Sequence, residues 1–180
     1  MELQYAPECM IDLETTGTKP GSKILSLGAT IFEPFTGVEL AAFYATISQE
    51  SCAAVGLVDD PDTMAWWAKQ DNQARMEAFK GEHELHLTLT TFSAWFVLNN
   101  PRRSWAQGQD FDFPMLSAAY AACGLVVPWK FWDARDTRTA YEVLKFDALA
   151  VTREGTFHNA LDDCRHQVIC LTKAQRGEAP

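Results

Sequence analysis

The chain has 180 residues, of which 47% are hydrophobic and 12% aromatic, which suffices for one domain with a substantial core and is too short for two. This composition excludes a disordered chain, and no apolar run approaches the roughly 18 residues that a transmembrane helix needs. The formal net charge of −9 is unusual for a nucleic-acid-binding protein, although clustered carboxylates that bind cations would reverse the local potential.

Cysteine usage and the N-terminus indicate the compartment. The five cysteines (Cys9, Cys52, Cys123, Cys164 and Cys170) are odd in number and include no CxxC pair, so neither a disulfide framework nor a zinc ribbon is expected. The first residues show no basic segment followed by an apolar one, so we expect no signal peptide. The sequence therefore predicts a cytoplasmic protein with reduced thiols and no membrane partner.

The predicted elements change in character along the chain. Three strands joined by short turns rich in Gly and Pro come first, at residues 9–13, 24–33 and 38–48. Helices and short strands then alternate. We expect helices from Asp60 and at 87–98, 113–123 and 137–144, and strands at 104–107 and 129–132. This order predicts a single α/β domain over residues 1–180, with a mixed sheet and helices on its faces.

The last helix is predicted from a single apolar stripe. Its members recur at spacings of four and three: Phe157, Leu161, Cys164, Val168 and Leu171. Residues 171–180 should form a loose tail.

The stretch MIDLETTG, residues 10–17, raises a chemical question. Side chains at positions i and i+2 of a strand point to the same face, so Asp12 and Glu14 should lie side by side. Two carboxylates at this range raise each other's pKa and cost stability unless a positive group lies between them. Simple solvation at the end of the strand would fit the spacing equally well.

Two further acidic clusters lie where predicted elements meet. GQDFDF places Asp110 and Asp112 between a strand and a helix, where either could be a helix N-cap. FHNALDD places His158, Asp162 and Asp163 at the start of the last helix, where the helix dipole favours acidic residues and the histidine could be a simple capping or surface residue.

Three acidic clusters and a histidine are harder to explain together than singly. Converging carboxylates form an all-oxygen ligand set, which is typical of hard cations such as Mg²⁺ or Mn²⁺. Two such ions about 3.5–4 Å apart can clamp the attacking and leaving oxygens of a phosphodiester. The pattern therefore predicts a site for two divalent cations.

The combined motif resembles a known family. Asp12-x-Glu14 followed by Thr-Thr-Gly, then Phe111-Asp112, then His158-x4-Asp163, resembles the DEDDh branch of the DnaQ-like 3′→5′ exonucleases over residues 10 to about 171. The stretches DPDTMAWWAKQ, FDFPML and KFWDARDTRT look more specifically like phage exodeoxyribonuclease A and RNase AS-type exoribonucleases. This resemblance implies an RNase H-like fold, in which helices flank a mixed five-stranded sheet.

The resemblance also implies a role for each residue. Asp12 would bridge both metal ions, Glu14 and Asp163 would hold the ion that carries the attacking water, and Asp112 would serve the second ion. His158 would be the general base, which suits an imidazole because it titrates near about 6.5.

Spacing alone leaves two of these assignments open. Helical geometry puts Asp162 beside His158 if both lie inside the helix, whereas Asp163 requires His158 to precede the first turn. Asp110 is likewise the alternative to Asp112.

The resemblance implies a substrate as well. The protein would release nucleoside monophosphates from the 3′ end of single-stranded DNA or RNA. Thr15, Thr16 and Phe111 would contact the terminal nucleotide. Apart from the resemblance, Trp66-Trp67 is expected to be core rather than a base-stacking platform, although one ring could be exposed. The alternatives are a non-catalytic nucleic-acid-binding relative and a phosphoesterase that acts on smaller substrates. Relatives are often homodimers, so a homodimer is a further expectation.

Overall fold

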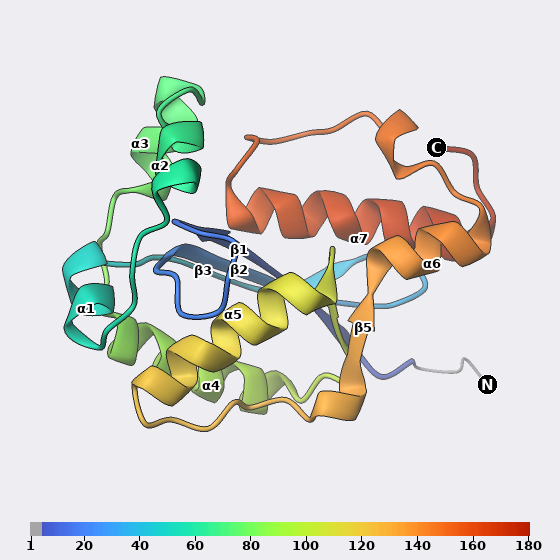
Figure 1. Ribbon diagram of the computed structural model, residues 1–180. Coiled ribbons are helices and arrows are strands. Elements are labelled where there is room, and N and C mark those ends of the chain that lie inside the picture. Colours follow the sequence, from blue (N-terminus) through green and yellow to red (C-terminus); the bar gives the residue numbers. More distant parts are fainter. Residues whose placement is uncertain (1–4) are drawn as a thin grey trace.

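The computed structural model describes residues 5–180 as a mixed five-stranded sheet with helices on both faces (Figure 1). The strands are β1 (Glu8–Thr15), β2 (Ile24–Phe32), β3 (Glu39–Thr46), β4 (Ser104–Ala106) and β5 (Ala134–Asp136). Their order in the sheet is β3-β2-β1-β4-β5. The first three strands pair antiparallel, whereas β4 and β5 extend the sheet parallel to β1. The predicted meander and the predicted fold class are confirmed.

The helices fall into two groups around this sheet. Helix α7 (Ala160–Arg176) and helix α6 (Thr137–Leu144) lie on one side, and α4 (Leu85–Asn99) and α5 (Gln109–Ala122) lie on the other (Figure 1). Shorter helices precede α4: α1 (Gln49–Ala54), α2 (Pro61–Trp67) and α3 (Asn72–Ala78). Two 3₁₀ turns complete the set, η1 (Phe131–Asp133) and η2 (Ala148–Ala150). No helix within residues 5–180 combines the length and the apolar character that crossing a membrane requires.

The alternation of β1 divides the core into two layers. Cys9, Ile11 and Leu13 face the layer that contains α4 and α5, whereas Met10 packs with apolar residues of α7. Because side chains two apart share a face, Asp12 and Glu14 point toward the side of the sheet that α7 covers. The strand pattern thus aims both carboxylates at the beginning of the last helix.

Gly28 allows α7 to approach the sheet closely. It lies opposite Asp12 in the antiparallel register of β1 and β2. A Cβ atom at this position would lie 2.2 Å from the backbone carbon of Ala160, far inside van der Waals contact. Only glycine therefore fits beneath the first turn of α7, and this contact fixes where that turn lies relative to Asp12.

Several predicted boundaries are wrong. Residues 129–132 are not a strand: Trp129 is buried in the core, the 3₁₀ turn η1 follows, and the fifth strand is Ala134–Asp136. The helix expected at 113–123 begins four residues earlier, at Gln109, because Gly108 with φ 101° is its N-cap.

The end of the chain also differs from expectation. The tail predicted from residue 171 is helical through Arg176, with Leu171 and Ala174 buried. Phe157 lies ahead of α7 and is exposed, so it is not part of the apolar stripe.

Candidate active site

Three carboxylates converge at the junction of β1 and α7. Asp12 and Glu14 come from β1, and Asp163 comes from the first turn of α7. One oxygen from each of the three lies within 4.8 Å of the others. The convergence follows from the side-chain alternation of β1 and from the close approach of α7 at Gly28.

Asp112 reaches the same region from the opposite layer. It lies in the first turn of α5, is buried, and its Oδ1 accepts a hydrogen bond of 3.1 Å from the backbone N–H of Leu13. Burial raises the pKa of Asp112 well above its usual value, and the negative charge of Asp12 raises it further. Asp112 therefore lies against the segment of β1 that carries Asp12 and Glu14.

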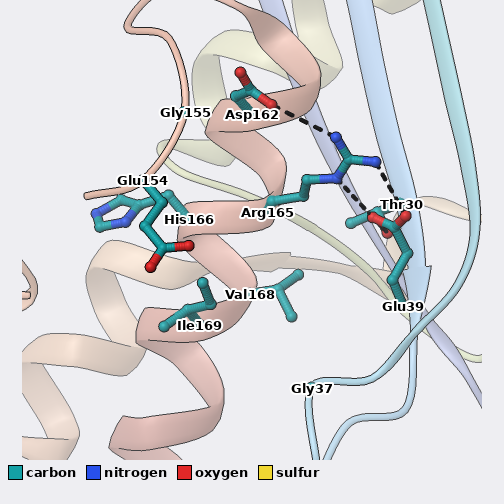
Figure 2. A pocket seen from close by; sticks show the side chains of 10 residues that line it. All are labelled: Thr30, Gly37, Glu39, Glu154, Gly155, Asp162, Arg165, His166, Val168 and Ile169. Carbon is teal, nitrogen blue, oxygen red and sulfur yellow. Dashed lines mark hydrogen bonds and ion pairs between the residues drawn. The ribbon is translucent and has the colours of Figure 1, made fainter. Parts of the chain in front are cut away.

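The two acidic neighbours that spacing left open lie elsewhere. Asp110 is exposed, and its carboxylate accepts a hydrogen bond from the side chain of Gln109. The Asp162 carboxylate accepts a hydrogen bond of 2.9 Å from the backbone N–H of Thr156 and lies 3.5 Å from Nη1 of Arg165. Figure 2 shows Asp162 directed toward Arg165. The structure thus brings Asp163, and not Asp162, together with the carboxylates of β1.

His158 precedes α7, as the Asp163 assignment requires. The N-cap of α7 is Asn159, and His158 adopts the left-handed conformation with φ 60°, which is uncommon for a residue with a side chain. Its Nδ1 lies 3.7 Å from Oε1 of Glu14, and this carboxylate raises the pKa of His158. The rings of Trp66 and Trp67 contact the imidazole edge-on, with centroids 5.1 Å and 5.8 Å away.

Asp12 is held by a residue that sequence reasoning missed. Nε2 of Gln167 donates a hydrogen bond of 2.8 Å to Oδ1 of Asp12. Burial and the charge of Glu14 raise the pKa of Asp12 to about 7, against a usual value of 3.8, and the hydrogen bond from Gln167 opposes this rise. Gln167 lies four residues after Asp163 on α7, so helical periodicity could have found it.

Arg153 also reaches the cluster and was missed. Its guanidinium forms an ion pair with Asp163 and lowers the pKa of Asp12. Arg153 lies in the irregular segment before α7, where no periodicity links it to Asp163, so the sequence carried no signal for this contact.

A pocket of about 600 Å³ opens beside Glu14. Thr15, Trp66 and Phe111 contribute to its lining, whereas Thr16 is fully buried. Trp67 is buried and its Nε1 donates a hydrogen bond to the carbonyl oxygen of Thr15, while Trp66 is 42% exposed. Trp67 is therefore a core residue, as expected for the pair, whereas Trp66 is the ring that is exposed.

A second hollow of about 470 Å³ lies between α7 and the β2–β3 hairpin (Figure 2). Its most prominent feature is Arg165, which links Glu39 to Asp162. None of Asp12, Glu14, Asp112 and Asp163 lines this hollow, so it is separate from the carboxylate cluster.

A mixed five-stranded sheet that carries converging carboxylates and a histidine is the arrangement expected from the motif's resemblance to the DEDDh 3′→5′ exonucleases. A sequence model of the family described as "3'-5' exoribonuclease Rv2179c-like domain" matches residues 7–175. The chain belongs to this family, and its enzyme class is that of a 3′→5′ exonuclease.

Individual relatives agree with this class. The chain is similar to the exodeoxyribonuclease of Enterobacteria phage T4, with 24% identity over an alignment of 200 residues. The match covers 93% of this chain and 88% of the phage protein. Among solved structures, it resembles the nuclease domain of 3'hExo, a DEDDh family member bound to rAMP, with a TM-score of 0.71 and 14% identity over 98% of this chain and 96% of that one.

A second solved structure is similar over a smaller part of its length. Exonuclease I of E. coli, in complex with a dT13 oligonucleotide, matches with a TM-score of 0.66 and 11% identity over 96% of this chain and 42% of that one. At these low identities the likeness shows the shared fold.

Proposed function

We propose that this chain hydrolyses single-stranded nucleic acid from its 3′ end and releases one nucleoside monophosphate at a time. The observation that carries the proposal is the convergence of Asp12, Glu14 and Asp163 within 4.8 Å, beside a pocket large enough for a nucleotide. Membership of an exonuclease family supports the same reaction.

The carboxylate cluster fits divalent cations. All of its donors are oxygens, which suit Mg²⁺ and Mn²⁺. Burial and the charge of Glu14 raise the pKa of Asp12, and a bound cation would offset both effects. Asp12, Glu14 and Asp163 would hold a cation, and Asp112 would contribute to a second. When bound, such ions would supply Lewis-acid polarisation of the scissile phosphate and would lower the pKa of a water.

His158 is the residue that we assign as general base. It lies beside Glu14 with one third of its side chain exposed, so a water at the mouth of the site can reach it. Only the neutral imidazole accepts a proton, and the Glu14 carboxylate favours the charged form. Activity should therefore rise with pH through the titration of His158.

The pocket beside Glu14 is our proposed seat for the terminal nucleotide. The exposed face of Trp66 and the ring of Phe111 offer stacking surfaces, which accept any base because every base has a π-face. A base must be unpaired to enter, which favours a single-stranded end. Thr15 lines the same pocket, whereas the next residue, Thr16, is fully buried and does not line it.

The relatives differ in the sugar of their substrate, because the family model is described as an exoribonuclease and the phage relative as an exodeoxyribonuclease. We would incubate matched 5′-labelled RNA and DNA oligonucleotides with the protein in Mg²⁺, Mn²⁺ or EDTA. The expected product is a ladder that shortens stepwise from the 3′ end and that disappears in EDTA.

A matched pair of variants tests the site. Asp163→Asn should lower the rate at least about 100-fold because it removes a charged ligand, whereas its neighbour Asp162→Asn should remain active. Shortening that continues in EDTA, or at the wild-type rate in Asp163→Asn, would contradict the proposal. Binding without turnover in Mn²⁺ would instead indicate a non-catalytic relative, and hydrolysis of p-nitrophenyl phosphate alone would indicate a phosphoesterase.

A further inference from the structure

Arg153 contacts both the carboxylate cluster and the irregular segment that precedes α7. The segment from η2 to α7 runs back along α7 (Figure 1), and Arg153 extends from this segment toward Asp163. Its Nη2 also donates a hydrogen bond of 3.3 Å to the carbonyl oxygen of Thr156, and its guanidinium lies over the ring of Phe157, 4.4 Å from the centroid. The side chain is only 16% exposed.

Arg153 is the only Lys or Arg among residues 5–180 that forms an ion pair with one of the four proposed metal ligands. The contact serves Asp163 in the same way that a cation would, because a positive charge beside clustered carboxylates offsets their mutual repulsion. The guanidinium and a metal ion would therefore compete for Asp163.

One N–H group of the Arg153 guanidinium is unpaired within residues 5–180. Its Nε is buried and has no hydrogen-bond partner within the described part of the chain. A buried donor without a partner costs stability, so such groups often serve a ligand. A guanidinium presents its N–H groups as a planar fork that matches a phosphate group.

The net charge of the site also favours a phosphate as a partner of Arg153. The four carboxylates carry −4 and two divalent cations carry +4, so the loaded cluster would be neutral without Arg153. Its guanidinium makes the total +1, which is opposite and equal to the charge of one phosphodiester.

We propose that Arg153 is an exchangeable counter-ion of this site. It pairs with Asp163 while no cation is bound, gives up this carboxylate when a divalent cation binds, and then pairs with a phosphate of the substrate. The inference rests on the proposed function, since it takes the carboxylates as metal ligands. Thr156 and Phe157 keep the guanidinium within reach of both partners.

The variant Arg153→Gln tests the exchange, because it keeps a polar side chain but removes the charge. Titration calorimetry of Mn²⁺ into the metal-free protein should show binding that is about three- to tenfold tighter, since a competing positive charge is gone. Binding of a phosphorothioate single-stranded oligonucleotide in Ca²⁺ should weaken about tenfold and should depend less steeply on salt, because one phosphate contact is lost.

The opposite signs of these two changes are the signature of the proposal. Arg165→Gln is the matched control, because Arg165 pairs with Glu39 and Asp162 outside the cluster, and it should leave both affinities unchanged. If Arg153→Gln weakened both affinities, Arg153 would merely orient Asp163. If neither affinity changed, it would be a structural residue. Either result overturns the proposal.

A measurement on the unaltered protein covers the case in which the variant does not fold. Phenylglyoxal modifies accessible guanidinium groups, and mass spectrometry reports the modification of the peptide that contains Arg153. Its modification should be slow in EDTA, faster in Mn²⁺, and slow again when the oligonucleotide is added. Equal rates in all three conditions would refute the exchange. If the wild-type protein bound no Mn²⁺ at all, the proposed function itself would fail.

Discussion

Asp12→Asn should stabilise the metal-free protein. In the folded chain the pKa of Asp12 is about 7 instead of 3.8, because burial and Glu14 disfavour its charge. Each pKa unit corresponds to about 1.36 kcal/mol, so the ionised side chain of Asp12 destabilises the fold by at most about 4 kcal/mol above pH 7. The remaining solvent exposure of Asp12 lowers this cost. The asparagine removes this charge, and its Oδ1 can still accept the hydrogen bond from Gln167.

The raised pKa of Asp12 determines how the stability gain from Asp12→Asn varies with pH. Between pH 3.8 and about 7 the folded protein binds a proton that the unfolded chain has released, so the wild type loses stability as the pH rises through this window. The gain from Asp12→Asn should therefore be small near pH 4 and largest near pH 8.

Urea unfolding in EDTA at several pH values measures this gain directly. Asp110→Asn is the control, because Asp110 is exposed and lies outside the cluster, and it should change stability little at any pH. A gain that did not vary with pH, or a loss of stability at pH 8, would refute the reasoning.

Two further substitutions test the elements around the site. Gly28→Ala should cost about 1–3 kcal/mol or more in urea unfolding and should lower activity, because its Cβ would lie 2.2 Å from the backbone of Ala160 and would push the start of α7 away. Wild-type stability in this variant would show that the contact is not as tight as described. Trp66→Ala should raise KM for oligonucleotides about tenfold by removing a stacking surface, whereas Trp132→Ala, which is exposed on η1, should leave KM unchanged. Equal effects of the two would argue against base stacking on Trp66.

The sequence predicted correctly those elements that carry a local signal, such as a capping residue. Residues 137–144 form α6 as expected, because Asp136 caps its first turn. The aromatic stretch at 129–132 has the composition of a strand but lacks its geometry: Trp129 enters the core, and Phe131 and Trp132 face solvent. The helices α1 and α3 are six and seven residues long, too short for a periodic pattern to reveal.

Those residues of the candidate site whose spacing belongs to a sequence motif could be predicted. Contacts that depend on the path of the chain in the fold could not. Same-face geometry on β1 anticipated Asp12 beside Glu14. The preference for Asp163 over Asp162 depended on where α7 begins, which the Gly28 contact and the Asn159 N-cap decide. Arg153 needed the path of an irregular segment, and no pattern of residue types encodes such a path.

The last helix of the chain supplies Asp163, and the first strand supplies Asp12 and Glu14. A ribosome makes β1 before α7, so a nascent chain that ends between them carries Asp12 and Glu14 without Asp163. Such a chain has no complete acidic cluster until α7 emerges and docks over Gly28. The topology would therefore keep the proposed metal site incomplete on the ribosome until α7 has been made.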